Sequence, residues 1–348
     1  MRYFLRKIAY SLLVLLGVAI LVFVMFQGFG DPARMIVGQT GDKRTLENIR
    51  KDLYLDQPKW KQFVLYLNDI SPICRHSQAD IEKKQLVGFF VGGTEKVGLK
   101  IPYLRKSYQT KKNVGQLLLE SLPGTMILAF TAMLFATIFG ILLGVVAAVK
   151  KGTWLDTASV FSSIAGISAP SFFIAIIIAF LFGVILHDYT GLNLTGSWYE
   201  IDEISGVQYV NSRNLILPAF TLGIRPLAII TQLTRSSMLD VLNQDYIRTA
   251  YAKGLPKRSV IFRHGLRNAL NPVITAITGW FAELLAGAFF IEYIFGWKGI
   301  GKITVEALEK LDYPVVMGSV LLNACIFIFI NLFADTLYRI IDPRIKQM

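Results

Sequence analysis

The sequence has 348 residues, of which 53% are hydrophobic and only 17% are charged, and its mean hydropathy is +0.50. Typical soluble chains carry roughly 25% charged residues. This composition excludes a disordered chain, a coiled coil and an ordinary cytosolic enzyme, and it predicts an integral membrane protein. The net charge of +12 does not indicate nucleic-acid binding, because the aromatic residues lie inside the apolar runs. We attribute the excess of cations to cytoplasmic loops.

Six apolar segments are long enough to span a membrane, since a spanning helix needs about 20 residues at about 1.5 Å per residue. They are predicted at residues 8–26, 122–149, 158–186, 215–239, 273–291 and 314–338. The first follows Arg2, Arg6 and Lys7, as in a secretory signal. Its apolar stretch is too long for a signal, however, and no small-residue cleavage site follows it. We therefore expect an uncleaved first helix in an all-α membrane protein of six transmembrane helices.

The charges of the short loops predict the orientation of the chain. With both termini inside, the inside segments hold fourteen Lys and Arg, whereas the short outside loops hold four. The inside segments are residues 1–7, 150–157, 240–272 and 339–348, and the short outside loops are residues 187–214 and 292–313. The positive-inside rule therefore predicts cytoplasmic N- and C-termini. Residues 27–116 are also basic, but long segments translocate largely regardless of charge.

The predicted topology divides the chain into three parts. Residues 1–26 form the N-terminal cytoplasmic end and the first helix, residues 27–116 an extracytoplasmic segment, and residues 117–348 a core of five transmembrane helices. The extracytoplasmic segment is expected to form a small subdomain, in which residues 87–93 are typical of a short strand and turn. A small residue at every fourth position of the second span predicts close helix packing. These residues are Ala132, Ala136, Gly140, Gly144 and Ala148.

The sequence offers no motif for chemistry of its own. Residues 296–302 match the GxxxxGK half of a phosphate-binding loop, but Ile303 stands where Ser or Thr would hold magnesium. The three histidines fall on both predicted sides of the membrane, and the two cysteines support neither a disulfide framework nor a metal cluster. We therefore predict no enzyme activity, no metal site and no cofactor bound by this chain.

The loop between the fourth and fifth predicted spans, residues 240–272, is the most informative segment. Asp245 is a candidate N-cap, Gly254 suits the left-handed position that ends a helix, and Pro256 suits the first turn of the next helix. The pattern predicts a helix, a tight turn and a second helix, with basic and apolar positions alternating. Taken alone, it also fits a basic amphipathic hairpin on anionic lipid.

This loop resembles the EAA loop of ABC importer permeases, in the version found in dipeptide, oligopeptide and nickel permeases. The resemblance rests on TAxAKGL at residues 249–255 and RHxLRNALxP at residues 263–272. Arg248 and Thr249 stand where the general form has Glu and Ala. Further motifs follow in the family's order: RYxxRK at 2–7, GDPA at 30–33, SYQT at 107–110, LPGT at 122–125, LGV at 143–145, LTRSSML at 233–239, ExxFxWxGxG at 292–301 and IDPR at 341–344. Two departures are Lys298, where the family has Pro, and residues 73–102, which are longer and more polar than usual.

The resemblance implies the type I ABC importer permease fold and a role for the loop. Residues 249–260 would form a coupling helix that docks on a cytoplasmic ATPase. Its small residues would allow close approach, and its cations would meet acidic or carbonyl groups, with lipid contact as the alternative. The implied coupling residues are Thr249, Ala250, Lys253, Gly254, Leu255, Arg263 and Arg267.

Two charged residues inside the predicted spans are candidates for the substrate pathway, because intramembrane charges are expensive and functional by default. Arg225 would face a substrate carboxylate and Glu283 an amine. The alternatives are that they pair with each other or with another chain, or lie nearer an interface. Asp335 is expected to anchor the inner end of the last span.

The function implied by the resemblance is a permease subunit of an ATP-driven importer in a bacterial or archaeal cytoplasmic membrane, first of all for di- or oligopeptides. Its expected partners are a second homologous permease, two cytoplasmic ATPase subunits that bind the ATP, an extracytoplasmic substrate-binding protein and membrane lipid. Nickel chelates or another small solute are alternative substrates. A stand-alone channel, a membrane enzyme and an exporter are less well supported, because the sequence shows no polar ring and no cluster of acids and histidines, and exporters generally lack this loop.

Overall fold

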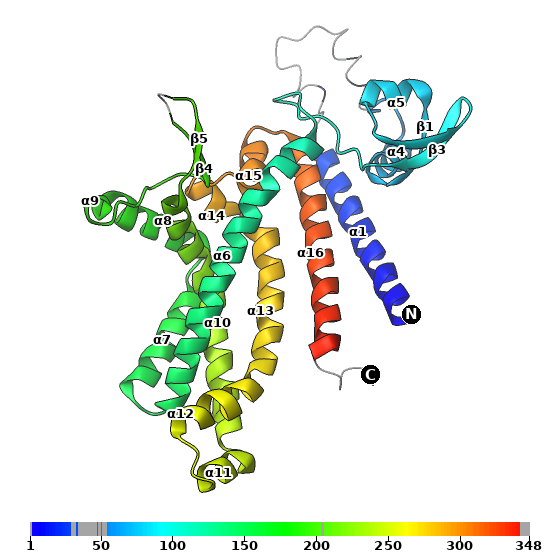
Figure 1. Ribbon diagram of the computed structural model, residues 1–348. Helices are drawn as coiled ribbons and strands as arrows, with labels where there is room; N and C mark the ends of the chain where they lie inside the picture. Colours follow the sequence, from blue (N-terminus) through cyan, green and yellow to red (C-terminus); the bar gives the residue numbers. More distant parts are fainter. Residues whose placement is uncertain are drawn as a thin grey trace. The chain divides into compact units, whose positions relative to one another are not determined.

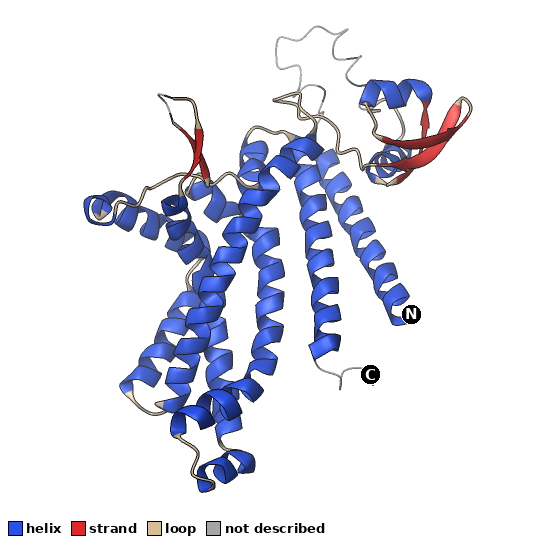
Figure 2. Cartoon of the chain, viewed as in Figure 1, coloured by secondary structure: helices blue, strands red, loops and turns tan. Residues whose placement is uncertain are grey.

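The computed structural model describes residues 2–28, 33, 47, 50, 54–202 and 205–341. Most of them are helical (Figures 1 and 2). The chain divides into two compact units, Met1–Leu122 with Ile303–Cys325 and Pro123–Lys302 with Ile326–Met348. Of the motifs quoted above, residues 30–32 and 342–344 lie outside the described residues.

Five helical segments among the described residues are long and apolar enough to cross a membrane. They confirm, by length and composition, the helical character of five of the six predicted spans. They are Arg6–Met25 within α1 (Arg2–Gly28), α6 (Val114–Val149), Ser212–Leu242 with α10 (Ile216–Leu242), Lys257–Ala286 with α13 (Arg267–Gly287), and Tyr313–Thr336 within α16 (Tyr313–Ile341).

The remaining predicted span, residues 158–186, is not one continuous helix. It consists of α7 (Trp154–Ser168) and α8 (Ser171–Phe180), which continues as a π-helical turn over Leu181–Ile185. The two parts are bent by 105° at the break between them. Pro170 causes the break, because it lacks an N–H and disfavours the helical conformation of the residue before it. Ala169 accordingly has an extended ψ of 138°.

The fifth predicted span also differs in its bounds. Its helix begins at α12 (Lys257–Ser259), continues through a π-helical segment (Val260–Leu266) and ends with α13 at Gly287. Phe289–Ile294 form a separate helix, α14, so the predicted end at residue 291 is too late. The short helices α9 (His187–Thr190), α11 (Asp245–Ala252) and α15 (Ile300–Glu309) complete the helical elements beyond the first 122 residues.

The small-residue stripe of α6 packs closely, as predicted, and its partner is α10. All five of its residues are buried. A Cβ added at Gly140 would lie 2.8 Å from Cγ2 of Ile230, and one added at Gly144 would lie 2.5 Å from Cβ of Thr234. Gly223 of α10 approaches α6 in the same way, since its Cβ would lie 2.9 Å from the carbonyl oxygen of Ala132. The close contact between α6 and α10 therefore requires glycine at these three positions, because a side chain there would overlap the other helix.

The segment between α1 and α6 contains a three-stranded antiparallel sheet in the order β1-β3-β2. Its strands are β1 (Ile73–Ser77), β2 (Gly88–Gly92) and β3 (Glu95–Lys100), with helices α4 (Lys59–Ile70) and α5 (Gln78–Lys84) packed on β1. The strand predicted within residues 87–93 is therefore confirmed by β2. Helix α4 also contacts α1, where the ring of Phe23 lies 5.1 Å from that of Phe63.

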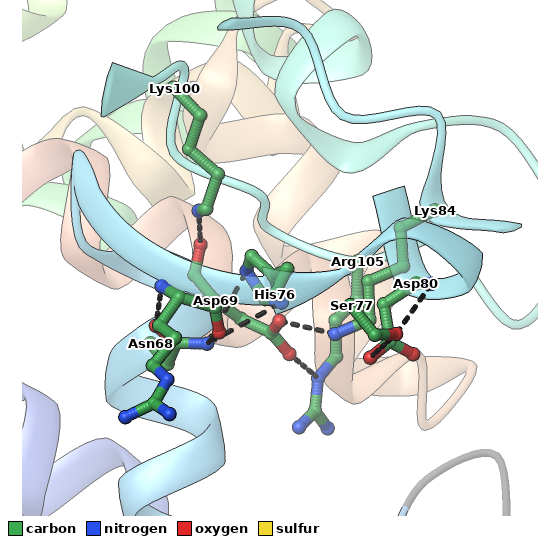
Figure 3. Close-up of polar contacts among 9 residues, drawn as sticks. Asn68, Asp69, His76, Ser77, Asp80, Lys84, Lys100 and Arg105 are labelled. Atoms are coloured by element: carbon green, nitrogen blue, oxygen red, sulfur yellow. Dashed lines mark hydrogen bonds and ion pairs between the residues drawn. The ribbon is translucent and has the colours of Figure 1, made fainter. Parts of the chain in front are cut away.

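Buried polar contacts connect this sheet to its helices (Figure 3). The carboxylate of Asp69 is 1% exposed, accepts a hydrogen bond from Lys84 Nζ at 2.5 Å, and lies 4.0 Å from Arg105 Nε. Its backbone carbonyl accepts a hydrogen bond from Lys100 Nζ. Burial, followed by the neighbouring Lys84 ammonium, lowers the pKa of His76. Asp69 of α4 thus binds α5 through its carboxylate and β3 through its backbone carbonyl.

Candidate functional site

Arg225 of α10 and Glu283 of α13 line one cavity. The cavity has a volume of 140 Å³, and its walls come from α7, α8, α10 and α13. Both side chains are exposed, and within the described part of the chain no ion pair joins them. The Arg225 guanidinium carbon lies 5.5 Å from the ring centre of Trp280, which also lines the cavity. The structure therefore brings both predicted pathway residues together and leaves both charges open to a ligand.

Two prolines shape the walls of this cavity. Pro226 stands inside α10 and has no N–H, so the carbonyl of Leu222, one turn earlier, loses its helical hydrogen bond. Leu222 also lines the cavity. The break at Pro170 places Ala169 and Ser171 on the opposite wall. The bend that interrupts the third apolar segment is thus part of the site, and a proline within an apolar run is the sequence signal that identifies it.

The predicted coupling loop forms a compact helical hairpin. The N-cap of α11 is Gln244, one residue earlier than the predicted N-cap Asp245, which lies in the first turn. Gly254 has a φ of +77°, which is the predicted left-handed conformation. Pro256 is the residue before α12 rather than within its first turn. Tyr246 and Asn268 connect the two sides of the hairpin through a 2.9 Å hydrogen bond from the amide Nδ2 to the phenol oxygen.

The seven predicted coupling residues divide into one buried and six exposed residues. Ala250 is only 6% exposed and packs with Ile247 and Val260 beneath the hairpin. The six exposed residues are Thr249, Lys253, Gly254, Leu255, Arg263 and Arg267. Nothing lies within 4 Å of a Cβ added at Gly254. The hairpin therefore has an apolar inner side that fixes its shape and an open basic outer side.

An ion pair connects α7 to α10 near this hairpin. Arg235, from the LTRSSML motif, donates from Nε to Asp156 Oδ1 at 2.5 Å and from Nη2 to Oδ2 at 2.9 Å. The backbone N–H of Gly152 donates to the same carboxylate at 3.0 Å. Asp156 is 6% exposed, so this bidentate pair fixes the turn between α6 and α7. Arg235 belongs to a motif that the sequence shows, but no sequence pattern identifies Asp156 as its partner.

Two of the family motifs meet at a buried carboxylate. Glu292 of α14 is fully buried and accepts hydrogen bonds from the Thr125 hydroxyl at 2.7 Å, from Gly301 N at 2.7 Å and from Lys302 N at 3.2 Å. Trp297 Nε1 donates to the carbonyl of Gly124 at 2.9 Å. The carboxylate thereby satisfies the first amides of α15, where a phosphate-binding loop would hold phosphate. The LPGT and ExxFxWxGxG motifs form one structural joint.

Glycine is required at this joint by close approach. A Cβ added at Gly124 would overlap the carbonyl oxygen of Lys298, and one added at Gly299 would overlap the Glu292 carboxylate. A Cβ added at Gly301 would lie 2.9 Å from Oε2 of the same carboxylate. The spacing of glycines around Trp297 is thus a packing requirement, which the sequence pattern alone did not reveal.

Comparison with known proteins places these features in a family. The family model "Binding-protein-dependent transport system inner membrane component" matches residues 140–347, and a model of the N-terminal part of such membrane components matches residues 1–129. The chain is 35% identical to the dipeptide transport system permease protein DppB of Alkalihalophilus pseudofirmus, over 99% of both chains. It is 35% identical to the di/tripeptide transport system permease protein DppB of Pseudomonas aeruginosa, over 98% of both. It is 33% identical to the glutathione transport system permease protein GsiC of Escherichia coli K12, over 99% of both.

Solved structures support the fold. A chain of the inward-facing MetNI methionine ABC transporter aligns with a TM-score of 0.50 at 16% sequence identity, covering 65% of this chain and 97% of that chain. At this identity the likeness concerns the fold alone. Together with the family models and the full-length relatives, it shows that the chain belongs to the binding-protein-dependent transport system inner membrane components, the permease subunits of ABC importers.

Proposed function

We propose that this chain forms half of the translocation pathway of an ATP-driven importer for short peptides. The observation that carries the proposal is the cavity shared by Arg225 and Glu283. A peptide with free ends carries one carboxylate and one ammonium group, and the cavity presents one cation and one anion that are not paired with each other. The names of the relatives, which transport dipeptides, tripeptides and glutathione, point to the same class of substrate.

The size of the cavity indicates how a peptide uses it. A volume of 140 Å³ holds a terminal group or one side chain rather than a whole peptide. The remainder of the binding site then belongs to the second homologous permease, facing this one. We propose that Arg225 binds the carboxylate end and that Trp280 holds the guanidinium in place by a cation–π contact.

The hairpin over residues 240–272 transmits the energy of ATP. We propose that its exposed residues Thr249, Lys253, Gly254 and Leu255 dock on a cytoplasmic ATPase, and that Arg263 and Arg267 contact acidic or carbonyl groups there. Ala250 contributes differently, because it is buried beneath the hairpin. A lever must be rigid to convert closure of the ATPases into a helix tilt, and the buried cluster and the Tyr246–Asn268 bond supply that rigidity.

A chain that forms half of the pathway and has no ATPase motif requires partner subunits. Two ATPase subunits bind the ATP, a second permease completes the pathway, and an extracytoplasmic binding protein delivers the substrate. The chain itself hydrolyses nothing and binds no cofactor. Both termini are cytoplasmic in a bacterial or archaeal cytoplasmic membrane, as the charges of the short loops indicate.

The test is uptake of trialanine by the complete transporter in proteoliposomes. Arg225→Ala and Glu283→Ala are each expected to lower uptake about tenfold or more, since a charge-assisted hydrogen bond contributes about 1.5–3 kcal/mol. Asp188→Ala, which removes an exposed charge of α9 that does not line the cavity, is the matched control and should transport normally. Assembly is followed by co-purification of the ATPases and the second permease. Normal trialanine uptake in both cavity variants would contradict the pathway assignment, and uptake of nickel chelates alone would replace the substrate class.

A further inference from the structure

A second concave surface lies on the hairpin that precedes α10. Strands β4 (Tyr199–Ile201) and β5 (Gln208–Val210) pair antiparallel. Together with the turn around Gly296 they line an open groove of 830 Å³. This volume falls within the range of about 300–1,000 Å³ that is usual for small-ligand sites. The groove is separate from the cavity of Arg225 and Glu283, with which it shares no lining residue.

One wall of the groove carries a fixed carboxylate. Glu200 accepts hydrogen bonds from Asn214 Nδ2 at 2.6 Å on Oε1, and from Tyr209 Oη and Asn211 Nδ2, both at 2.9 Å, on Oε2. The bonds from Asn211, Tyr209 and Asn214 lower the pKa of Glu200, so it is ionised at neutral pH. An ionised carboxylate has about four acceptor positions. One position on Oε1 therefore stays open for a further donor.

The lining of the groove also includes two cations, Lys298 and Lys302. Lys298 lines the groove and is exposed, and its backbone N–H donates to Ser197 Oγ at 3.1 Å. Within the part of the chain that the structure describes, no acceptor binds its ammonium group. Lys302 also lines the groove, but its Nζ is 3.3 Å from the carbonyl of Gly296, to which it donates. Lys298 is thus the groove's available cation.

The segments that carry Glu200 and Lys298 are joined rigidly. Gly196 N donates to the carbonyl of Phe295 at 2.9 Å, and Asn214 Nδ2 donates to the carbonyl of Ser197 at 3.1 Å. A Cβ added at Gly196 would overlap the Asn214 side chain. Phe295 is 2% exposed and belongs to the main buried core of its unit. The anion and the cation are therefore held on one firm frame, which lowers the cost of ordering them around a ligand.

We propose that this groove is a second binding site for short peptides, in which Glu200 accepts the peptide ammonium and Lys298 binds the peptide carboxylate. It lies on the side that the predicted topology places outside, so it would receive a peptide before the peptide enters the cavity. The proposal rests on the proposed function, because it assumes a peptide substrate.

The experiment measures binding of trialanine to the purified full-length permease in lipid nanodiscs by saturation-transfer NMR. Trialanine has charges only at its ends. Glu200→Gln and Lys298→Glu are each expected to weaken binding about tenfold, and N-acetylation or C-amidation of the peptide should weaken binding to the wild type similarly. Lys310→Glu is the matched control, because it reverses an exposed cation in the same predicted outside loop that does not line the groove. The Arg225→Ala permease is measured beside them to separate the cavity from the groove.

Each outcome either supports or overturns the groove as a peptide-binding site. Weaker binding in Glu200→Gln and Lys298→Glu, with Lys310→Glu unchanged, supports the groove. Unchanged binding in both groove variants, with loss in Arg225→Ala, overturns the groove and leaves the proposed function standing. Failure of the wild type to bind trialanine overturns the groove as a peptide site, and uptake by the complete transporter then decides the proposed function separately. If Lys298→Glu weakens capture of the binding protein and leaves trialanine binding unchanged, the groove is a protein contact and the proposal is wrong.

Discussion

The cavity of Arg225 and Glu283 and the groove of Glu200 and Lys298 present the same pair of charges in different surroundings. The cavity has 140 Å³ among four membrane-associated helices, whereas the groove has 830 Å³ and is open. A charge interaction strengthens as the effective dielectric falls, and salt screens it strongly only where water reaches it. The same pair of charges should therefore interact with a ligand more strongly in the cavity than in the groove. We expect the cavity to distinguish between ligands and the groove to bind them less selectively.

The largest effect is expected from charge reversal in the cavity. Arg225→Glu places two carboxylates in one small cavity and should lower trialanine uptake about 100-fold, a loss of about 3 kcal/mol, because it removes the cation for the peptide carboxylate and also repels that carboxylate. The double variant Arg225→Glu with Glu283→Arg restores one charge of each sign and should recover part of the uptake. Initial rates of uptake in proteoliposomes measure both.

Ionic strength sharpens this contrast between the two sites. Between 0.01 M and 0.15 M salt the Debye length falls from about 30 Å to about 8 Å. The effect of Lys298→Glu on trialanine binding should shrink over this range, and the effect of Arg225→Glu on uptake should shrink less, because the cavity is narrower than the groove. Equal salt dependence of the two variants would show that both sites are equally solvated and would remove the distinction.

Stability should depend on the joint around Glu292, whose turn at Gly296 and Lys298 lines the groove. Glu292→Gln replaces an acceptor of three buried hydrogen bonds and places an amide against the N–H groups of Gly301 and Lys302. We expect the free energy of unfolding to fall by about 2 kcal/mol, the cost of an unsatisfied buried donor. Unfolding in mixed detergent, followed by tryptophan fluorescence, measures it. Asp188→Asn, at an exposed position of α9, is the control and should unfold like the wild type.

The sequence was sufficient for the features that depend on local pattern. Apolar length identified the helices, the repeat of small residues predicted close packing of the second span, and Gly254 indicated its own left-handed turn. Arg225 and Glu283 were found because charges are rare inside apolar segments. Their presence in one cavity was not predictable, because it depends on how α10 and α13 pack.

Other features escaped the sequence analysis because they arise from contacts between distant segments. The partner of Asp156 is Arg235, and the partner of Glu292 is Thr125, which lies in another helix. Neither pairing leaves a periodic signal. The 105° bend at Pro170 did leave a signal, but hydropathy averaged over a window conceals a single proline. The placement of Ala250 beneath the hairpin depends on the rotation of α11, which a short helix with few apolar residues does not fix.

A smaller effect is expected from a substitution in the hairpin that changes the coupling to ATP hydrolysis and leaves peptide binding unchanged. Gly254→Ala introduces no steric contact, because nothing lies within 4 Å of the added Cβ, but φ is +77°. The left-handed conformation costs an L-residue about 1–2 kcal/mol, so part of the hairpin population should shift away from the docking conformation. ATP hydrolysed per trialanine imported should rise, while trialanine binding to the permease alone stays unchanged. A change in binding would mean that the hairpin and the peptide sites are not independent.

The smallest effect is a pH dependence of the stability of the β4–β5 hairpin. The hydrogen bonds that Glu200 accepts from Tyr209, Asn211 and Asn214 lower the pKa of its carboxyl group, so the ionised form of Glu200 stabilises the hairpin. For an acid with a lowered pKa, this stabilisation is fully present above the ordinary carboxyl pKa of about 4.3 and is lost as the pH falls through the lowered folded-state pKa. Hydrogen exchange over residues 199–202 and 205–211, corrected for intrinsic rates, should therefore show constant protection between pH 7 and pH 5 and declining protection in more acidic buffer. Glu200→Gln has no such charge and should show weaker protection at pH 7, with no decline in acid. A decline already above the ordinary carboxyl pKa would mean that the three bonds do not favour the carboxylate, and the groove would then lack the fixed anion that distinguishes it from an ordinary polar surface.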